Sequence, residues 1–220
     1  MIRRILLCAS LLHLAISPSN ATISFLIDGD LLKDSTGGSL VQSSLFMLVS
    51  STSDGTFDTI TEGSFTATGS LLNADDRVLF RGDLLGNPNV NGVLQVATGG
   101  LSYNAGSLTN WTIGDPLALL WFPTLTAGSN TIPAGTPYGL YTNASAVDGS
   151  DAWITPADGT TDHYLLFYTK DGVRLSPGSG AANLASAGNA SLTVGAIPEP
   201  SRSLLGLIGF GALTLRRRRR

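Results

Sequence analysis

The chain has 220 residues, which is enough to bury a hydrophobic core, and its glycine-rich, sparsely charged composition excludes a helical bundle and a disordered chain. Residues 22–197 carry five basic and fifteen acidic side chains, a net charge of −10. Nucleic acid is therefore excluded as an expected partner, because proteins that bind it need a basic surface. The single cysteine, Cys8, lies in the apolar N-terminal run, so neither disulfides nor thiolate metal sites are expected in the body.

Residues 1–21 have the three parts of a signal peptide. Arg3 and Arg4 form a basic start, residues 5–16 are apolar, and Pro18 ends the apolar run before a group of small residues. We predict cleavage after Ala21. We also predict export by the general secretory route, because the apolar run is more hydrophobic than the twin-arginine route favours.

The body, residues 22–176, contains short runs typical of strands, separated by clusters of Gly, Asp, Asn, Ser and Pro. Many short strands at this spacing predict an all-β fold, an antiparallel β-sandwich or a jelly-roll-like domain. A short helix is expected on either side of it, in the signal peptide and in the C-terminal tail. The expected strands are 23–27, 44–50, 78–84, 93–97, 117–122, 138–142, 152–155 and 164–169.

Three segments of the body allow more specific predictions. The sequence SSLFMLVSS around residues 44–50 is apolar on both faces and predicts a central strand. Asp171 and Gly172 suit a type I′ turn, which would join 164–170 and 173–175 as a hairpin whose LLFY run is buried at least in part on both faces. Residues 177–196 are rich in small side chains and predict a loop, a last strand at 192–194 and a linker.

Catalytic chemistry finds little support in the sequence. The body has one histidine, His163, and no serine lies in a Gly-x-Ser-x-Gly context. His163 is expected at the surface. Asp75 and Asp76 are neighbours, and neighbours on a strand point to opposite faces, so they do not form a facing carboxylate pair. We expect no catalytic residues and no enzymatic activity.

Carboxylates occur in three glycine-containing turns, at residues 28–30, 54–58 and 148–151. Such turns can offer oxygen ligands to Ca²⁺, but none matches the EF-hand loop, and Asp and Gly are also the residues that turns prefer. We therefore predict no metal site and no cofactor.

Aromatic side chains suggest sugar binding as an alternative function. An exposed aromatic platform could contact a sugar, although aromatic residues more often fill the core of a β domain. Trp121 lies between apolar neighbours and is expected in the core. Trp111 and Trp153 have polar neighbours and are the predicted sugar-contact residues, with Tyr103, Tyr138 and Tyr141 as further members of the platform.

The tail, residues 197–220, has three parts in order. Pro198, Glu199 and Pro200 come first, an apolar run at 204–215 follows, and Arg216, Arg217, Arg218, Arg219 and Arg220 close the sequence. As a helix the apolar run is about 18 Å long at ~1.5 Å per residue, which is shorter than the roughly 20 residues of a full span. The arginines would hold this end on the cytoplasmic side and stop transfer across the membrane.

This tail resembles the PEP-CTERM sorting signal, which is recognised by exosortase, a membrane-embedded enzyme of Gram-negative-type bacteria that resembles cysteine transpeptidases. The resemblance implies export through the inner membrane, cleavage near the Pro-Glu-Pro motif and delivery to the cell surface or to an exopolysaccharide matrix. The expected partners are an exosortase-type processing enzyme, the inner membrane during sorting and a matrix polysaccharide.

From these features we expect an exported, non-enzymatic protein of the cell surface or extracellular matrix. The first alternative is a carbohydrate-binding module of the exopolysaccharide matrix. A secreted hydrolase of unrecognised type is the second alternative, and the missing nucleophile context disfavours it.

Overall fold

The computed structural model describes residues 22–64, 66–84, 93–102, 108–146, 150–167 and 189–196. This part of the chain consists of strands, bridges and turns without a helix, so the described part of the body is all-β, as predicted. The expected signal helix, the helix of the tail and the hairpin around Asp171 and Gly172 lie outside the described residues. Among the residues described, none belongs to a helix that is long and apolar enough to cross a membrane.

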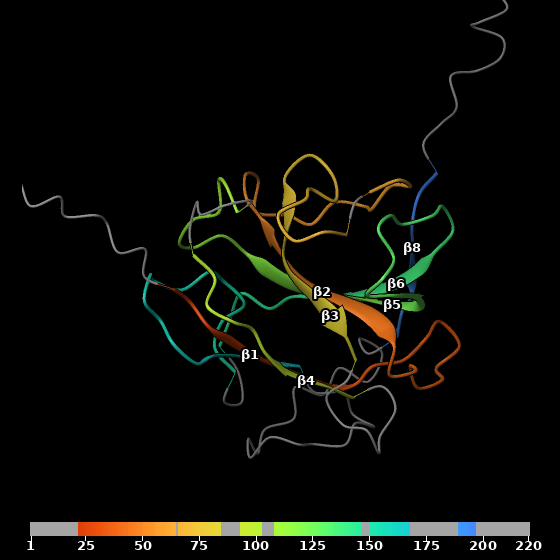
Figure 1. Ribbon diagram of the computed structural model, residues 1–220, viewed down its shortest axis with the longest axis horizontal. Coiled ribbons are helices and arrows are strands. Elements are labelled where there is room, and N and C mark those ends of the chain that lie inside the picture. Colours follow the sequence, from red (N-terminus) through yellow and green to blue (C-terminus); the bar gives the residue numbers. More distant parts are fainter. Residues whose placement is uncertain are drawn as a thin grey trace, which may run out of the picture.

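The larger sheet has five strands, all paired antiparallel, in the order β3-β2-β5-β6-β8 (Figure 1). Its strand β2 lies between β3 and β5, which confirms the prediction of a central strand at 44–50. The bounds are β2 Ser44–Ser51, β3 Asp76–Asp83, β5 Leu117–Thr126, β6 Pro137–Tyr141 and β8 Leu192–Thr193.

The smaller sheet has three described strands in the order β4-β1-β7, namely β4 Val93–Ala97, β1 Phe25–Leu31 and β7 His163–Phe167. Strand β1 pairs antiparallel with β4 but parallel with β7, so the expectation of a purely antiparallel body is wrong for this pair. A parallel pair needs a crossover connection, and here the chain between β1 and β7 passes through four strands of the larger sheet.

One expected strand is missing. Residues 152–155 form only an isolated bridge between Ile154 and Pro116. Within this segment the Trp153 N–H bonds to the Asn143 carbonyl, and the Trp153 carbonyl accepts from the Leu117 N–H. The segment therefore follows an irregular path beside the start of β5 instead of joining a ladder.

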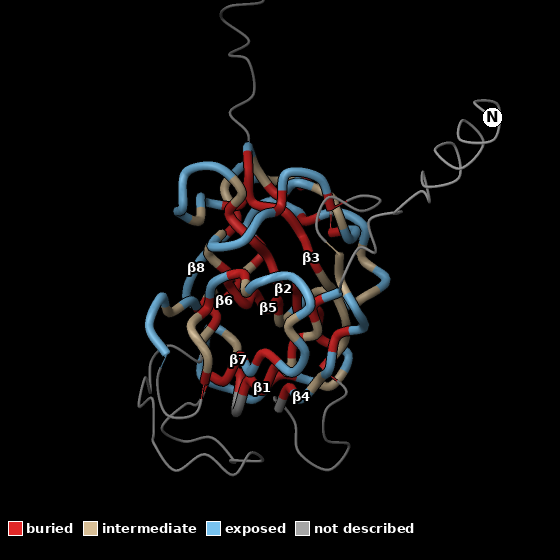
Figure 2. Tube along the Cα trace, turned by 90° about the vertical axis from the view of Figure 1, so that its left-hand side faces the viewer, coloured by how far each residue is buried: buried red, intermediate tan, exposed pale blue. Residues whose placement is uncertain are grey.

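The core explains why β2 is buried along its whole length. On one face, Phe46 and Leu48 join a cluster with Phe25 and Leu165 of the smaller sheet, so the two sheets face each other across a shared core. On the opposite face, a second cluster is closed by loop residues, among them Ile60, Leu72, Ile132 and Val194. Figure 2 shows these layers, with β1, β4 and β7 on one side of the larger sheet and loops on the other.

An aromatic row crosses the larger sheet on the face toward the smaller one. In register, Gly82 of β3 pairs with Phe46 of β2, Phe46 with Trp121 of β5, and Trp121 with Gly139 of β6. A Cβ atom at Gly82 would lie 2.8 Å from the Phe46 ring, and one at Gly139 would lie 2.0 Å from the Trp121 ring. The two glycines thus leave room for the rings to lie across the neighbouring strands. Close packing of this kind is a common reason for a glycine within a strand.

Candidate functional site

The predicted sugar-contact residues are buried. Trp111 is 0% exposed and Trp153 is 1% exposed, so the prediction that they are surface aromatics is wrong. Tyr138 and Tyr141 are buried as well, and Tyr103 lies outside the described residues. Trp121 is 0% exposed, which confirms its expected place in the core.

Local turns explain why polar sequence neighbours misled the prediction for Trp111. Asn110 has a φ of 64° and Gly114 a φ of 88°, so the chain bends on both sides of the tryptophan. Thr112 bonds to the Asp115 carboxylate at the surface, through its N–H at 2.7 Å and its hydroxyl at 3.0 Å. The Trp111 side chain points inward instead, where its Nε1 donates to Thr155 Oγ1 at 2.8 Å. A turn can therefore have polar flanks and still bury its central aromatic ring.

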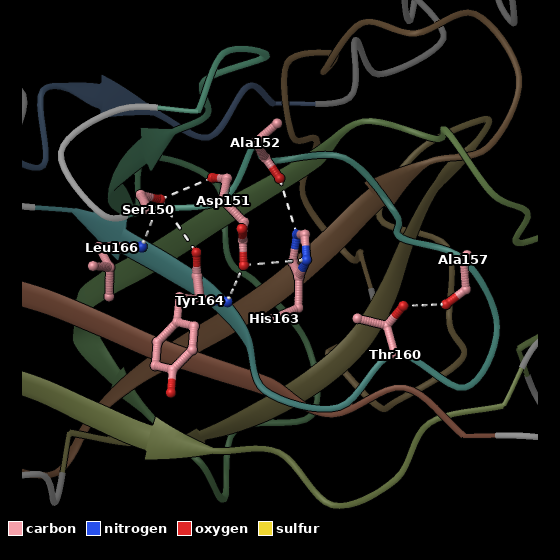
Figure 3. A network of polar contacts seen from close by, with 8 residues as sticks. All are labelled: Ser150, Asp151, Ala152, Ala157, Thr160, His163, Tyr164 and Leu166. Atoms are coloured by element: carbon pink, nitrogen blue, oxygen red, sulfur yellow. Dashed lines mark hydrogen bonds and ion pairs between the residues drawn. The ribbon is translucent and has the colours of Figure 1, made fainter.

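His163 is also buried, at 8% exposed, where a surface position was expected. It begins β7, and its ring packs edge-on against Phe25 with the ring centres 5.6 Å apart. Nε2 shares a 3.0 Å hydrogen bond with the Ala152 carbonyl oxygen, and Nδ1 lies 3.5 Å from Asp151 Oδ2 (Figure 3). The ring thus ties the loop at 150–152 to the edge of the smaller sheet.

The same loop is fastened by main-chain contacts. Asp151 bonds twice to Tyr164: its N–H donates to the Tyr164 carbonyl at 2.7 Å, and its Oδ2 accepts the Tyr164 N–H at 2.8 Å. Ser150 Oγ accepts the Leu166 N–H at 3.0 Å and contacts the carbonyl oxygens of Asp151 and Tyr164. Figure 3 shows these partners around the end of β7. The Ser150 hydroxyl forms hydrogen bonds with backbone groups, as expected of a serine that stabilises a loop.

Three carboxylates, two from the turn at 54–58 and one that precedes β3, gather in one place. Ligand oxygens of Asp54, Asp58 and Asp75 all lie within 4.8 Å of one another. They border a depression of about 450 Å³ that Arg77 and Asn110 also line. The sequence singled out the turn at 54–58, but it gave no sign that Asp75, which precedes β3, would join it.

Hydrogen bonds organise this acidic cluster of Asp54, Asp58 and Asp75. Asp75 Oδ2 accepts from Ser51 Oγ at 3.2 Å, from the Ser53 N–H at 3.1 Å and from the Asp54 N–H at 3.2 Å. Hydrogen bonds from the backbone and the hydroxyl of Thr56 lower the pKa of the Asp54 carboxyl below its ordinary value. These donors stabilise the charged carboxylates of Asp54 and Asp75.

Asp76 follows Asp75 in the chain, and its pKa is shifted in the opposite direction to that of Asp54. It is 3% exposed, and burial raises the pKa of its carboxyl from 3.8 to about 6. Its Oδ2 accepts the Asp58 N–H at 3.0 Å and a hydrogen bond from Asn73. The negative charges of Asp75 and Asp58 add to the upward shift, because each opposes a further charge nearby.

Asp54, Asp58 and Asp75 are the described residues placed to hold a cation. Their oxygens are hard ligands of the kind that Ca²⁺ prefers, but Ca²⁺ usually takes six to eight oxygen ligands, and three carboxylates supply only part of that set. Arg77 lines the same depression with a positive charge. We therefore treat the cluster as a hydrogen-bonded turn. Of the other acidic turns, Asp28 lies in β1 and Asp151 contacts His163.

The outer face of the smaller sheet carries a groove of about 310 Å³. Tyr164 of β7 is 45% exposed beside it, and the groove runs over Leu26 and Asp28 of β1 to Gln95 and Ala97 of β4. Tyr164 was not among the predicted sugar-contact residues, because the LLFY run that follows it indicated a buried strand. The signal that could have found it is the period of two along β7, in which Tyr164 is exposed between buried His163 and Leu165.

The residues predicted for sorting lie outside the described residues. They are the cleavage residue Ala21, the motif Pro198, Glu199 and Pro200, and the arginines Arg216 to Arg220. Their roles in cleavage and sorting are inferred from the sequence alone and stay predictions.

Comparison of the chain with family models, with curated proteins and with solved structures finds no match.

Proposed function

We propose that this chain is an exported, non-enzymatic protein of the cell surface or extracellular matrix of a Gram-negative-type bacterium. In this proposal its tail is processed at the inner membrane by an exosortase-type enzyme. The observation that carries the proposal is the order Pro198-Glu199-Pro200, apolar run, arginine cluster, together with a signal peptide at residues 1–21. A single Pro-Glu-Pro would be uninformative, whereas the three parts in order with a leader are specific.

The physical properties of the tail suit a transient membrane contact. Pro198 and Pro200 lack amide donors and keep the backbone extended, which is the form that a protease-like groove binds. The apolar run at 204–215 is short for a lasting anchor, and the arginines beside it resist transfer across the membrane. Cleavage near the motif would therefore free the body from the membrane.

The described body supports a non-catalytic role. His163 directs both ring nitrogens to the loop at 150–152, and the hydroxyl of Ser150 is engaged by backbone groups. We further propose that the body is a β-sandwich or a jelly-roll-like domain. The support for this is the core that the two sheets share between Phe25 and Leu165 on one side and Phe46 and Trp121 on the other.

The proposal predicts how the tail is processed. The mature protein should end near Pro198 and lack the arginines. Changing Glu199→Ala should leave the tail uncleaved and retain the protein in the inner membrane, because the processing enzyme loses its recognition motif. Deleting residues 216–220 removes the stop signal, so the precursor should stay unprocessed in the membrane or pass through it with the rest of its tail. Intact-mass analysis of protein extracted from the surface and from the inner membrane measures this directly.

Ser203→Ala is the matched control in the tail, since it preserves the motif, the apolar run and every charge. It should be processed like the unaltered protein. Surface protein whose mass still includes Arg216 to Arg220 would sink the sorting proposal, and so would normal processing of the Glu199→Ala variant.

The proposal also predicts the side of the membrane on which the body lies. Alkaline phosphatase inserted at Gly149 should be active, because this enzyme requires the oxidising compartment outside the inner membrane to form its disulfides. The same insertion in a chain without residues 1–21 should be inactive. A stable but inactive fusion in the presence of the leader would contradict export of the body.

A further inference from the structure

We propose that the outer face of the smaller sheet binds a neutral polysaccharide in the groove beside Tyr164. This inference goes beyond export and sorting, since it assigns a ligand class to named residues of the body. It is also independent of the two tryptophans that the sequence suggested, both of which are buried.

The strand register arranges the groove in two rows. Tyr164 of β7 pairs with Leu26 of β1, and Leu26 pairs with Ala97 of β4. Two residues along β1, Asp28 pairs with Gln95 of β4 on one side and with Leu166 of β7 on the other. Because side chains alternate along each strand, both rows point to the face opposite the core. One row is therefore aromatic and aliphatic, and the other carries the buried side chains of Leu166 and Asp28 and the exposed amide of Gln95.

The two rows fit the chemistry of a sugar chain. A pyranose ring has an apolar face of C–H groups and a rim of hydroxyls, and an aromatic ring offers a flat surface for the apolar face. The row of Tyr164, Leu26 and Ala97 crosses three strands, roughly 10 Å at ~4.8 Å per strand spacing, which is about the length of two sugar rings. Ala97 is exposed and small, so it leaves the far end of the row open.

The second row supplies hydrogen-bonding groups along the side of that path. Gln95 is exposed and offers both a donor and an acceptor. Asp28 lines the same groove but is only 3% exposed, so Gln95 supplies the hydrogen bonds of this row. Successive residues of one face lie about 6.8 Å apart along a strand, so hydroxyls on the rim of a ring over Leu26 would point toward this row.

Charge decides in favour of a neutral polymer. Residues 22–197 carry a net charge of −10, and the formal charge in the groove is that of Asp28. A polyanion would be repelled by the negative charge of the body and of the groove, whereas a neutral polymer would not be repelled. A second copy of the chain would also meet repulsion from the same net charge.

Affinity electrophoresis of the exported protein tests the inference. Gels containing mixed-linkage β-glucan, xylan or galactomannan should retard the protein in at least one case, and a gel containing the polyanion alginate should not. Tyr164→Ala should weaken binding about tenfold or more, since it removes the stacking surface. Tyr164→Phe keeps the ring and should bind within about threefold of the unaltered protein.

Ala97→Leu is the second test, because it fills the open end of the row while leaving Tyr164 and the core unchanged. It should reduce retardation as strongly as Tyr164→Ala. Ile113→Ala is the matched control, since Ile113 is an apolar side chain that is 62% exposed and is not part of the groove. It should migrate like the unaltered protein, and thermal melting checks that each variant is folded.

The inference is overturned if none of the three neutral polymers retards the protein. It is equally overturned if Tyr164→Ala and Ala97→Leu bind like the unaltered protein, or if alginate binds as well as the neutral polymers. Sedimentation that shows self-association dependent on Tyr164, without retardation by a glycan, would assign the face to a second copy instead. None of these outcomes bears on the mass of the processed C-terminus, so the sorting proposal stands or falls separately.

Discussion

Replacing Gly139 by alanine is expected to lower the free energy of unfolding by about 3 kcal/mol, at the upper end of the usual cost of overpacking a core. A Cβ atom at this position would lie 2.0 Å from Trp121 Cε2 and Cζ2. The indole cannot move aside freely, because Trp121 is 0% exposed and its ring packs against Phe167 with the centres 5.8 Å apart. The new methyl group must therefore displace either the ring or strand β6.

Thermal and urea unfolding of the purified protein measure this effect, and a loss of about 3 kcal/mol corresponds to roughly 6–12 °C in Tm for a body of this size. Gly99→Ala is the matched control, because a Cβ atom there would have no neighbour within 4 Å. The control should change stability by less than about 0.5 kcal/mol. A Gly139→Ala protein as stable as the Gly99→Ala protein would contradict the proposed packing of Trp121 on β6.

Replacing Asp76 by asparagine is expected to stabilise the protein at neutral pH. The raised pKa of about 6 means that the folded state binds the proton of Asp76 more tightly than the unfolded state does. The stability that the protonated Asp76 contributes is fully present below its unfolded pKa near 3.8, and it is lost as the pH rises through its folded pKa of about 6. Asparagine is neutral at every pH, and its oxygen can still accept hydrogen bonds from the Asp58 N–H and Asn73.

The measurement is the free energy of unfolding at about pH 4.5 and about pH 7.5, where the variant should gain up to roughly 3 kcal/mol at the higher pH and only about 1 kcal/mol at the lower one. Asp34 and Asp54 have lowered pKa values, so the stability that they contribute is lost at still lower pH, outside this window. Asp158→Asn, at an exposed position, controls for the loss of one negative charge. Equal pH dependence in the Asp76→Asn and unaltered proteins would refute the burial of this charge.

The strands were largely predictable, because each depends on a local pattern. Runs of apolar residues between turn clusters located β2, β4 and β5, with β4 at the predicted bounds of 93–97 and β2 within one residue. The run SSLFMLVSS indicated burial on both faces, and both faces of β2 are covered. The failure at 152–155 has a physical cause, since Trp153 bonds to Asn143 and Leu117 in an irregular path that no strand propensity can indicate.

The candidate sites were much less predictable, because exposure depends on the direction of a side chain relative to the rest of the molecule. Trp111 and His163 have polar neighbours in sequence, yet turns and partners at distant positions place both rings inside. Tyr164 stands beside an apolar run, and the face of β7 that it occupies is turned outward. The acidic cluster joins Asp75 to the turn at 54–58 across a gap in sequence that no motif bridges.

By itself, the sequence determined the all-β class of the body, the place of most strands and the patterns from which export and sorting are proposed. These properties depend on neighbouring residues: period-two patterns, turn residues, and the order of basic, apolar and proline-containing segments. Only the tertiary structure decided the parallel pairing of β1 with β7, the fit of Phe46 and Trp121 over Gly82 and Gly139, and the groove beside Tyr164. The reason is that register and facing sheets bring together residues far apart in the chain, and a shift of one residue would turn each side chain to the opposite face.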